Sequence, residues 1–162
     1  MAGHSPYNLA MHTHHHRPHI NLRLERWHRR SIYASLLLLL SSGGVWLIVR
    51  YFMRPGSQFG ASIHPLEPWA MRFHGGAAML GLFFLGSLMN AHIRRAIKAG
   101  RNLASGLSLL SLLAVLVVSG FGLYYLADEE SRNLWSLTHW IIGLAAALVF
   151  ILHLLIGQRQ RG

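Results

Sequence analysis

Histidine is the residue type whose placement in this sequence could carry chemistry. The chain has 12 histidines, and five of them lie in or beside long apolar stretches: His28, His74, His92, His139 and His153. An ionisable side chain inside a membrane-spanning stretch is costly, so such a residue is a candidate functional group. One such histidine could equally be a hydrogen-bonded packing residue, but several at matching depths favour a shared role.

The spacing of His139 and His153 suits two metal centres stacked along one helix. They are 14 residues apart, which on an α-helix returns the chain to within about 40° of the same face after a rise of ~21 Å. Two b-type haems stacked across a bilayer need such ligands, because each iron takes axial histidines. Gly143 lies on the stripe between them, where a small residue lets a porphyrin or another backbone approach. The chain has no cysteine, so any haem would be held non-covalently.

Each haem needs a second axial ligand. His74 lies about as far below the outer end of its apolar stretch as His139 does, so we expect these two to share an outer haem. Gly75 directly follows His74 and could clear the face of the macrocycle. For an inner haem at His153 the residues leave two candidate partners: His28, just before the first stretch, and His92, at the end of the second.

Two arginines are also candidates for the cofactor site. Arg50 and Arg72 interrupt apolar stretches near the outer side of the predicted membrane, where positive charge is disfavoured. Haem propionates are anionic, and arginine is the usual partner of a carboxylate. A contact with another subunit is the alternative role for both.

The elements that must position these residues are four long apolar stretches. Of the whole chain, 52% is apolar and only 12% is charged, about half the charged share of a soluble domain. Each stretch is long enough to cross a hydrocarbon core of ~30 Å. We therefore predict an all-α, integral membrane four-helix bundle, with spans at residues 31–52, 69–93, 103–126 and 134–156.

The distribution of charge predicts the orientation of this bundle. The chain has a formal net charge of +10, and 11 of its Lys and Arg residues fall on the side of the two termini against 4 on the other. By the positive-inside rule, both termini are expected in the cytoplasm. The basic balance is therefore a topology signal, and we expect no nucleic-acid partner.

The pattern resembles the di-haem cytochrome b subunits of membrane-bound formate dehydrogenases and nickel–iron hydrogenases. The resemblance covers about residues 28–157 and rests on four short motifs around histidine: Arg-Trp-His28-Arg-Arg, Arg-Phe-His74-Gly-Gly, Thr-His139-Trp and Leu-His153-Leu-Leu-Ile-Gly. In that family these positions ligate two haems, which favours His28 over His92 for the inner site. Some segments also resemble small bacterial cytochrome b561-like four-helix proteins.

The resemblance implies an electron-transfer subunit of an oxidoreductase complex in a bacterial inner membrane. It would pass electrons between a quinone pool and a docked partner, such as a multihaem cytochrome, an Fe–S protein or a molybdenum protein. Alternatives are a cofactor-free structural or assembly subunit, and a histidine-based metal transporter. The transporter is the weaker alternative, because every acidic residue falls outside the predicted spans, whereas transporters carry Asp or Glu within theirs.

The predicted domain organisation has three parts. Residues 1–27 form a basic, histidine-rich cytoplasmic tail, residues 28–157 form the di-haem domain, and residues 158–162 form a short cytoplasmic tail. The run His12-Thr13-His14-His15-His16 could bind Zn, Cu or Ni. A solvated tail, or a segment that becomes ordered on another subunit, is the alternative role for residues 1–27.

Overall fold

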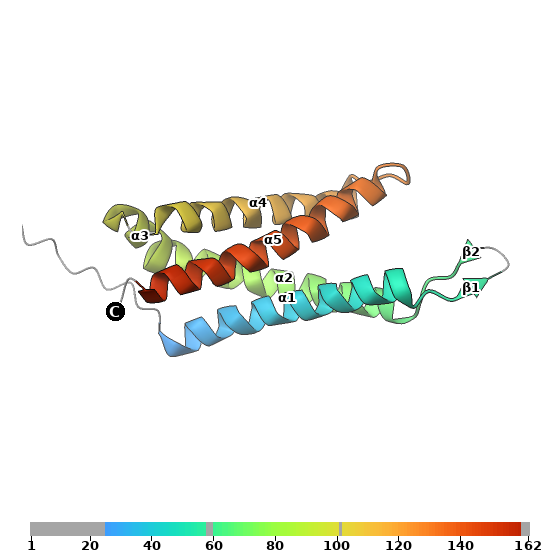
Figure 1. Ribbon diagram of the computed structural model, residues 1–162, viewed down its shortest axis with the longest axis horizontal. Helices are drawn as coiled ribbons and strands as arrows, with labels where there is room; N and C mark the ends of the chain where they lie inside the picture. The colour runs from blue at the N-terminus through green and yellow to red at the C-terminus, as the bar shows by residue number, and fades with distance from the viewer. Residues whose placement is uncertain (1–24, 58–59, 101, 160–162) are drawn as a thin grey trace, which may run out of the picture.

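The computed structural model describes residues 25–57, 60–100 and 102–159. The predicted histidine-rich tail therefore lies outside the described residues up to residue 24, and so do the last three residues of the chain. Four long helices occupy most of the described chain (Figure 1): α1 (Arg26–Phe52), α2 (Leu66–Leu88), α4 (Leu103–Tyr125) and α5 (Arg132–Arg159). They agree with the four predicted stretches to within a few residues, so the all-α class is confirmed.

Three of these helices are long and apolar enough to cross a membrane. The mean hydropathy of their most apolar segments is 2.0 for α1, 2.2 for α4 and 2.5 for α5. Among the described residues, α2 is also 23 residues long but does not belong to this set. It carries Glu67, Arg72 and His74 together with several glycines, all of which lower its hydropathy.

The second predicted stretch does not end as a regular α-helix. After Leu88 it passes through one π-helical turn, η1 (Met89–Ile93), and then through the short helix α3 (Arg94–Ala99). Helix α3 ends at Gly100 in the left-handed conformation (φ 64°), where glycine has no Cβ penalty. Asn102 also has a positive φ of 52°, and the chain turns there into α4.

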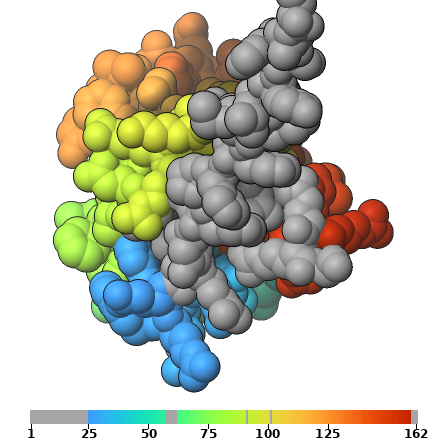
Figure 2. All heavy atoms as spheres, turned by 90° about the vertical axis from the view of Figure 1, so that its left-hand side faces the viewer, coloured from blue at the N-terminus to red at the C-terminus, as the bar shows by residue number. Residues whose placement is uncertain are grey.

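The helices form two antiparallel pairs, which we call the first hairpin (α1 and α2) and the second hairpin (α4 and α5). Close backbone approaches occur mainly within each hairpin and only sparsely between them. At one end, the β1–β2 end, strand β1 (Gly56–Ser57) pairs antiparallel with β2 (Gly60–Ala61), and α4 turns into α5 nearby. At the opposite end, the α3 end, the start of α1 (blue), α3 (yellow-green) and the end of α5 (red) face the viewer in Figure 2.

Side chains of α5 make the aromatic contacts between the two hairpins. The rings of Tyr33 on α1 and Phe150 on α5 meet edge to face, with centroids 6.0 Å apart. Within the described chain the buried apolar residues are few and mostly small: Val49, Ala70, Ala77 and Ala146. Large apolar side chains instead face outward along the helices, and Phe73 is 68% exposed. Small residues at helix contacts and apolar side chains outside are typical of a bundle in lipid.

Candidate functional site

Two pairs of histidines face each other between the hairpins. At the β1–β2 side, His74 of α2 faces His139 of α5, with ring centroids 6.2 Å apart and ring planes inclined by 76°. At the α3 side, His92 of η1 faces His153 of α5, with centroids 6.4 Å apart and planes inclined by 88°. Each pair takes one ring from each side of the bundle, and the four rings form two similar sites at different depths.

The pair His92–His153 is associated with the irregular part of the second stretch. Turns of π-helix are rare and often occur at functional sites. A small cavity of about 80 Å³ opens beside this pair, and its lining includes both histidines, Asn102 and Gly106. The Nδ1 atom of His92 and the Oδ1 atom of Asn102 are buried without a hydrogen-bond partner in the described chain.

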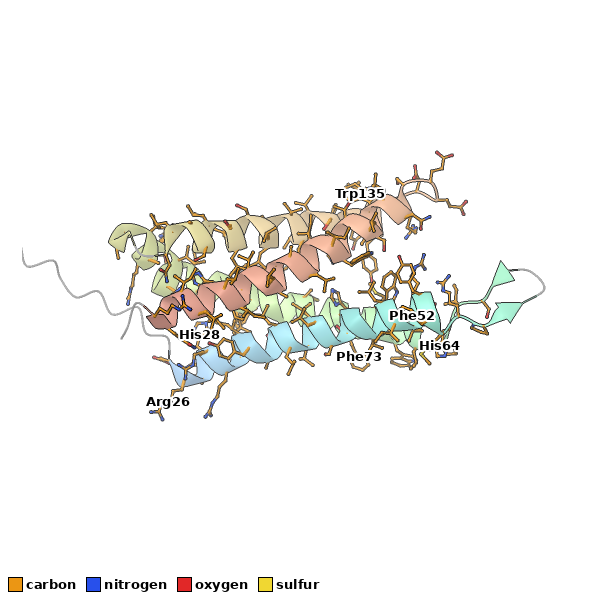
Figure 3. The ribbon with its side chains drawn as sticks, viewed as in Figure 1. Arg26, His28, Phe52, His64, Phe73 and Trp135 are labelled. Atoms are coloured by element: carbon orange, nitrogen blue, oxygen red, sulfur yellow. The ribbon has the colours of Figure 1, made fainter. Side chains whose placement is uncertain are left out.

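His28 makes contacts within its own hairpin. Its ring stacks on Trp27 with centroids 5.0 Å apart, and its Nε2 atom lies 2.6 Å from the hydroxyl of Ser87 on α2. It lies near Arg26 at the start of α1, as labelled in Figure 3. Of the two candidate partners for His153, the structure therefore brings His92 alongside it and joins His28 to Ser87.

In three of the facing histidines, the ring nitrogen Nδ1 lies within hydrogen-bond distance of a serine hydroxyl. Each serine comes from the other helix of the same hairpin. The hydroxyl oxygen lies 3.0 Å from Nδ1 in the pair Ser42–His74, 2.8 Å in Ser119–His139 and 2.9 Å in Ser105–His153. In each of these rings, Nε2 is the nitrogen that the serine leaves free.

A glycine follows each of these serines and lies against the same ring. A Cβ atom placed on Gly43 or on Gly120 would lie 3.4 Å from Cε1 of His74 or His139, and one on Gly106 would lie 3.6 Å from Cε1 of His153. These Ser-Gly pairs were not predicted from the sequence. Their signal was present, because Ser105 and Ser119 have the same separation along the chain as His139 and His153.

The other predicted site residues have contacts of their own. The guanidinium of Arg50 lies over the ring of Trp46 at 5.2 Å, and that of Arg72 over the ring of Trp69 at 5.0 Å. A Cβ on Gly75 would meet open space, whereas one on Gly143 would touch Leu116 of α4 at 3.8 Å.

An ion pair closes the β1–β2 end. Arg54 donates two hydrogen bonds to the carboxylate of Glu67, at 2.7 and 2.6 Å, and Arg50 lies 3.8 Å from the same carboxylate. Glu67 is only 5% exposed and precedes the predicted span that begins at Trp69. The hydrogen bonds from Arg54 outweigh the effect of burial and hold the pKa of Glu67 below its ordinary value. This cluster ties the end of α1 to the start of α2.

The donor set of each histidine pair limits which metal group could be held there. The described chain contains no cluster of three or more His, Cys, Asp or Glu side chains suited to a bare metal ion. Two histidines can hold a metal whose other ligands belong to a macrocycle, as in a bis-histidine haem. An imidazole nitrogen binds zinc at about 2.0–2.1 Å; with a similar bond to iron and a ring centroid about 1.1 Å behind the nitrogen, the two centroids would be about 6.3 Å apart. The observed separations of 6.2 and 6.4 Å lie close to this value and also within the range of ordinary aromatic ring pairs, about 4.5–7 Å.

Comparison of the chain with protein-family models, with curated proteins and with solved structures finds no match.

Proposed function

We propose that this protein is a membrane-embedded di-haem cytochrome of b type that acts as the electron-transfer subunit of an oxidoreductase complex. The proposal rests on one observation: two facing histidine pairs have centroid separations of 6.2 and 6.4 Å, and the two rings of each pair come from opposite sides of the bundle. These separations lie close to the ~6.3 Å expected for two imidazoles that bind one metal by bonds of about 2.0–2.1 Å.

In this proposal one haem is held by His74 and His139, and the other by His153 and His92. The choice of His92 over His28 follows from the 6.4 Å separation and from the bond between His28 and Ser87. When bound, each haem would supply a reversible one-electron couple of its iron. The protein's own part is to fix the ligands at two depths, which lie ~21 Å apart along α5 at about 1.5 Å per residue, and to surround them with apolar side chains.

The direction of the chain in the membrane is part of the same proposal. Within the described residues, basic side chains gather at the α3 end: Arg26, Arg29, Arg30, Arg94, Arg95, Lys98 and Arg159. Glu25 is the one acidic residue among the described residues at that end, whereas the basic side chains at the β1–β2 end are accompanied by Glu67, Asp128, Glu129 and Glu130. By the positive-inside rule, the α3 end faces the cytoplasm of a bacterial inner membrane. A quinone pool and a docked redox subunit would be the electron-exchange partners.

The test is the dithionite-reduced minus oxidised spectrum of the purified full-length chain, with haem counted as pyridine haemochrome. We expect a sharp b-type α-band and about two haems per chain, since each iron takes two of the four facing histidines. His139→Ala should remove one haem and keep the other. His64→Ala is the matched control, because His64 lies in the loop before α2 and accepts a hydrogen bond from the Leu66 amide.

A second candidate function is that of a cofactor-free structural subunit. It is favoured by the serine bonds of His74, His139 and His153, which give each ring a polar partner without any metal. The centroid separations also remain within the range of aromatic pairs, about 4.5–7 Å. A correctly folded chain that takes up no haem, either during expression or on titration with hemin, would establish this candidate and refute the cytochrome.

A further inference from the structure

Each of the three serines has two possible hydrogen-bond partners, a histidine and a backbone carbonyl. Each hydroxyl has one proton to donate. It also lies near a backbone carbonyl, which belongs to the same helix or, for Ser105, to Asn102 just before that helix. These Oγ···O distances are 2.6 Å from Ser42 to Leu38, 3.3 Å from Ser119 to Leu116 and 3.4 Å from Ser105 to Asn102. The hydroxyl can give its proton to this carbonyl or to the histidine, and donation to a carbonyl of the preceding turn is common for serine in helices.

When the serine proton goes to the carbonyl, the histidine donates its Nδ1–H to the serine oxygen. A neutral imidazole carries one N–H and one lone pair, and the hydrogen bond at one nitrogen decides which nitrogen holds the proton. In this arrangement, the lone pair of His74, His139 and His153 is on Nε2. We propose that Ser42, Ser119 and Ser105 are positioning residues that fix this tautomer and present Nε2 as a ready metal ligand.

The glycines support the same assignment. Gly43, Gly120 and Gly106 each directly follow one of the serines, and their missing side chains leave space in which the Cε1 edge of the ring lies. The serine hydroxyl thus accepts a hydrogen bond from Nδ1, and the glycine leaves space for the neighbouring ring atom Cε1. The three Ser-Gly pairs form one repeated device, which we call the Ser-Gly cradle.

The cradle occurs twice in the second hairpin because of helix register. In an antiparallel pair, moving forward along α4 means moving backward along α5. The step forward from Ser105 to Ser119 therefore matches the equal step backward from His153 to His139. Both serine–histidine bonds are present in the structure, and one register satisfies both.

His28 and His92, which have no Ser-Gly cradle, are held differently from the other three histidines. Ser87 lies 2.6 Å from the carbonyl of Phe84 and 2.6 Å from Nε2 of His28, so the same arrangement there would place the proton of His28 on Nε2, the opposite tautomer. His92 has a buried Nδ1 without a partner in the described chain. Of the two sites, His74–His139 therefore has both ligands held by cradles, whereas His92–His153 has one.

The role of the cradles toward haem rests on the proposed function, but the tautomers can be measured without it. Histidines that donate Nδ1–H to an acceptor are more basic metal ligands, and a more basic ligand favours ferric iron. We expect Ser119→Ala and Ser42→Ala to shift the midpoint potential of one haem to more positive values, with the haem count unchanged. Ser105→Ala should do the same for the other haem, and threonine at each position should restore the original potential because it keeps the hydroxyl.

Ser87→Ala is the matched control, since its hydroxyl bonds a histidine outside both pairs and its loss should leave both potentials unchanged. The second readout is the ¹⁵N spectrum of histidine-labelled full-length protein before haem is added. His139 and His153 should appear as Nδ1–H tautomers, and His139 should become a mixture in Ser119→Ala. Unchanged potentials together with unchanged tautomers in the alanine variants would overturn the cradle, whereas absence of haem binding with the predicted tautomers would overturn only the proposed function.

Discussion

A methyl group added at Gly122 tests how closely α4 and α5 must pack for the histidines to reach their serines. Gly122 is buried on α4, three residues beyond Ser119, and lies against Trp135 in the first turns of α5. A Cβ atom at Gly122 would lie 2.7 and 2.8 Å from Cε3 and Cη2 of the Trp135 ring, and closer still to Cζ3. Ordinary contacts between carbon atoms are ~3.5–4.0 Å, so either the ring or the helix must move.

The expected cost of Gly122→Ala follows from this overlap. Adding a methyl group to a filled contact typically costs about 1–3 kcal/mol, and a rigid indole cannot yield as a flexible side chain would. In the opposite direction, alanine is favoured over glycine within a helix by up to about 1 kcal/mol. Gly44→Ala on α1 separates the two effects, because a Cβ there meets nothing within 4 Å. We expect Gly122→Ala to be about 1–3 kcal/mol less stable than Gly44→Ala.

The assay is reversible unfolding of the full-length chain in mixed micelles, followed by circular dichroism and tryptophan fluorescence. Combining the change with Trp135→Ala gives a double-mutant cycle. In the absence of the indole, Gly122→Ala should cost nothing or stabilise slightly. Equal stabilities of Gly122→Ala and Gly44→Ala, with Trp135 intact, would refute this packing of α4 on α5 and the helix register derived from it.

Two further predictions concern the α3 side and the β1–β2 end. His92→Ala should lower the haem content to about half, because it removes an axial ligand of one of two irons, whereas His28→Ala should leave it near the unaltered value; the reverse result in a pyridine haemochrome assay would reassign the ligand. The lowered pKa of Glu67 means that its pair with Arg54 stabilises the fold above the carboxyl's ordinary pKa of 4.5 and is lost as the pH falls through the lower folded value. The protection factors of amides around this pair, corrected for the intrinsic exchange rate at each pH, should fall in acid by the equivalent of about 1.5–3 kcal/mol, and Glu67→Gln should abolish this pH dependence.

Hydropathy was sufficient to predict the four helices because each stretch is long and apolar, and some of the helix ends coincide with helix-breaking residues. Pro55 and Pro65 separate α1 from α2, and Gly100 ends α3 in a left-handed conformation. The π-helical turn at Met89–Ile93 was not predicted. Its residues include no proline or glycine, so the local sequence gives no signal for leaving the α-helix.

Counting residues from the ends of the apolar stretches predicted the pairing of His74 with His139 in depth, because both helices are regular there. The same count predicted that His92 lies closer than His153 to the membrane side that carries both chain termini, because it assumed the rise of a regular α-helix throughout. The last residues before His92 form the π turn, which has more residues in each turn and so advances less. The resemblance also favoured His28, whose bond to Ser87 depends on the contact between α1 and α2 and could not be read from spacing.

Most contacts of the histidines and of the helices lie within one hairpin, so the histidine rings can be oriented before any ligand joins the two hairpins. Every cradle bond joins two helices of one hairpin, and close backbone packing is also mainly within hairpins. Each hairpin can therefore orient its own rings independently of the other. The facing rings of different hairpins share no hydrogen-bond partner in the described chain that would fix their separation, yet the two separations are nearly equal, at 6.2 and 6.4 Å. A ligand that bonds to both rings would fix their separation, so in the proposed cytochrome the cofactor would join the two hairpins in addition to the contact of Tyr33 with Phe150.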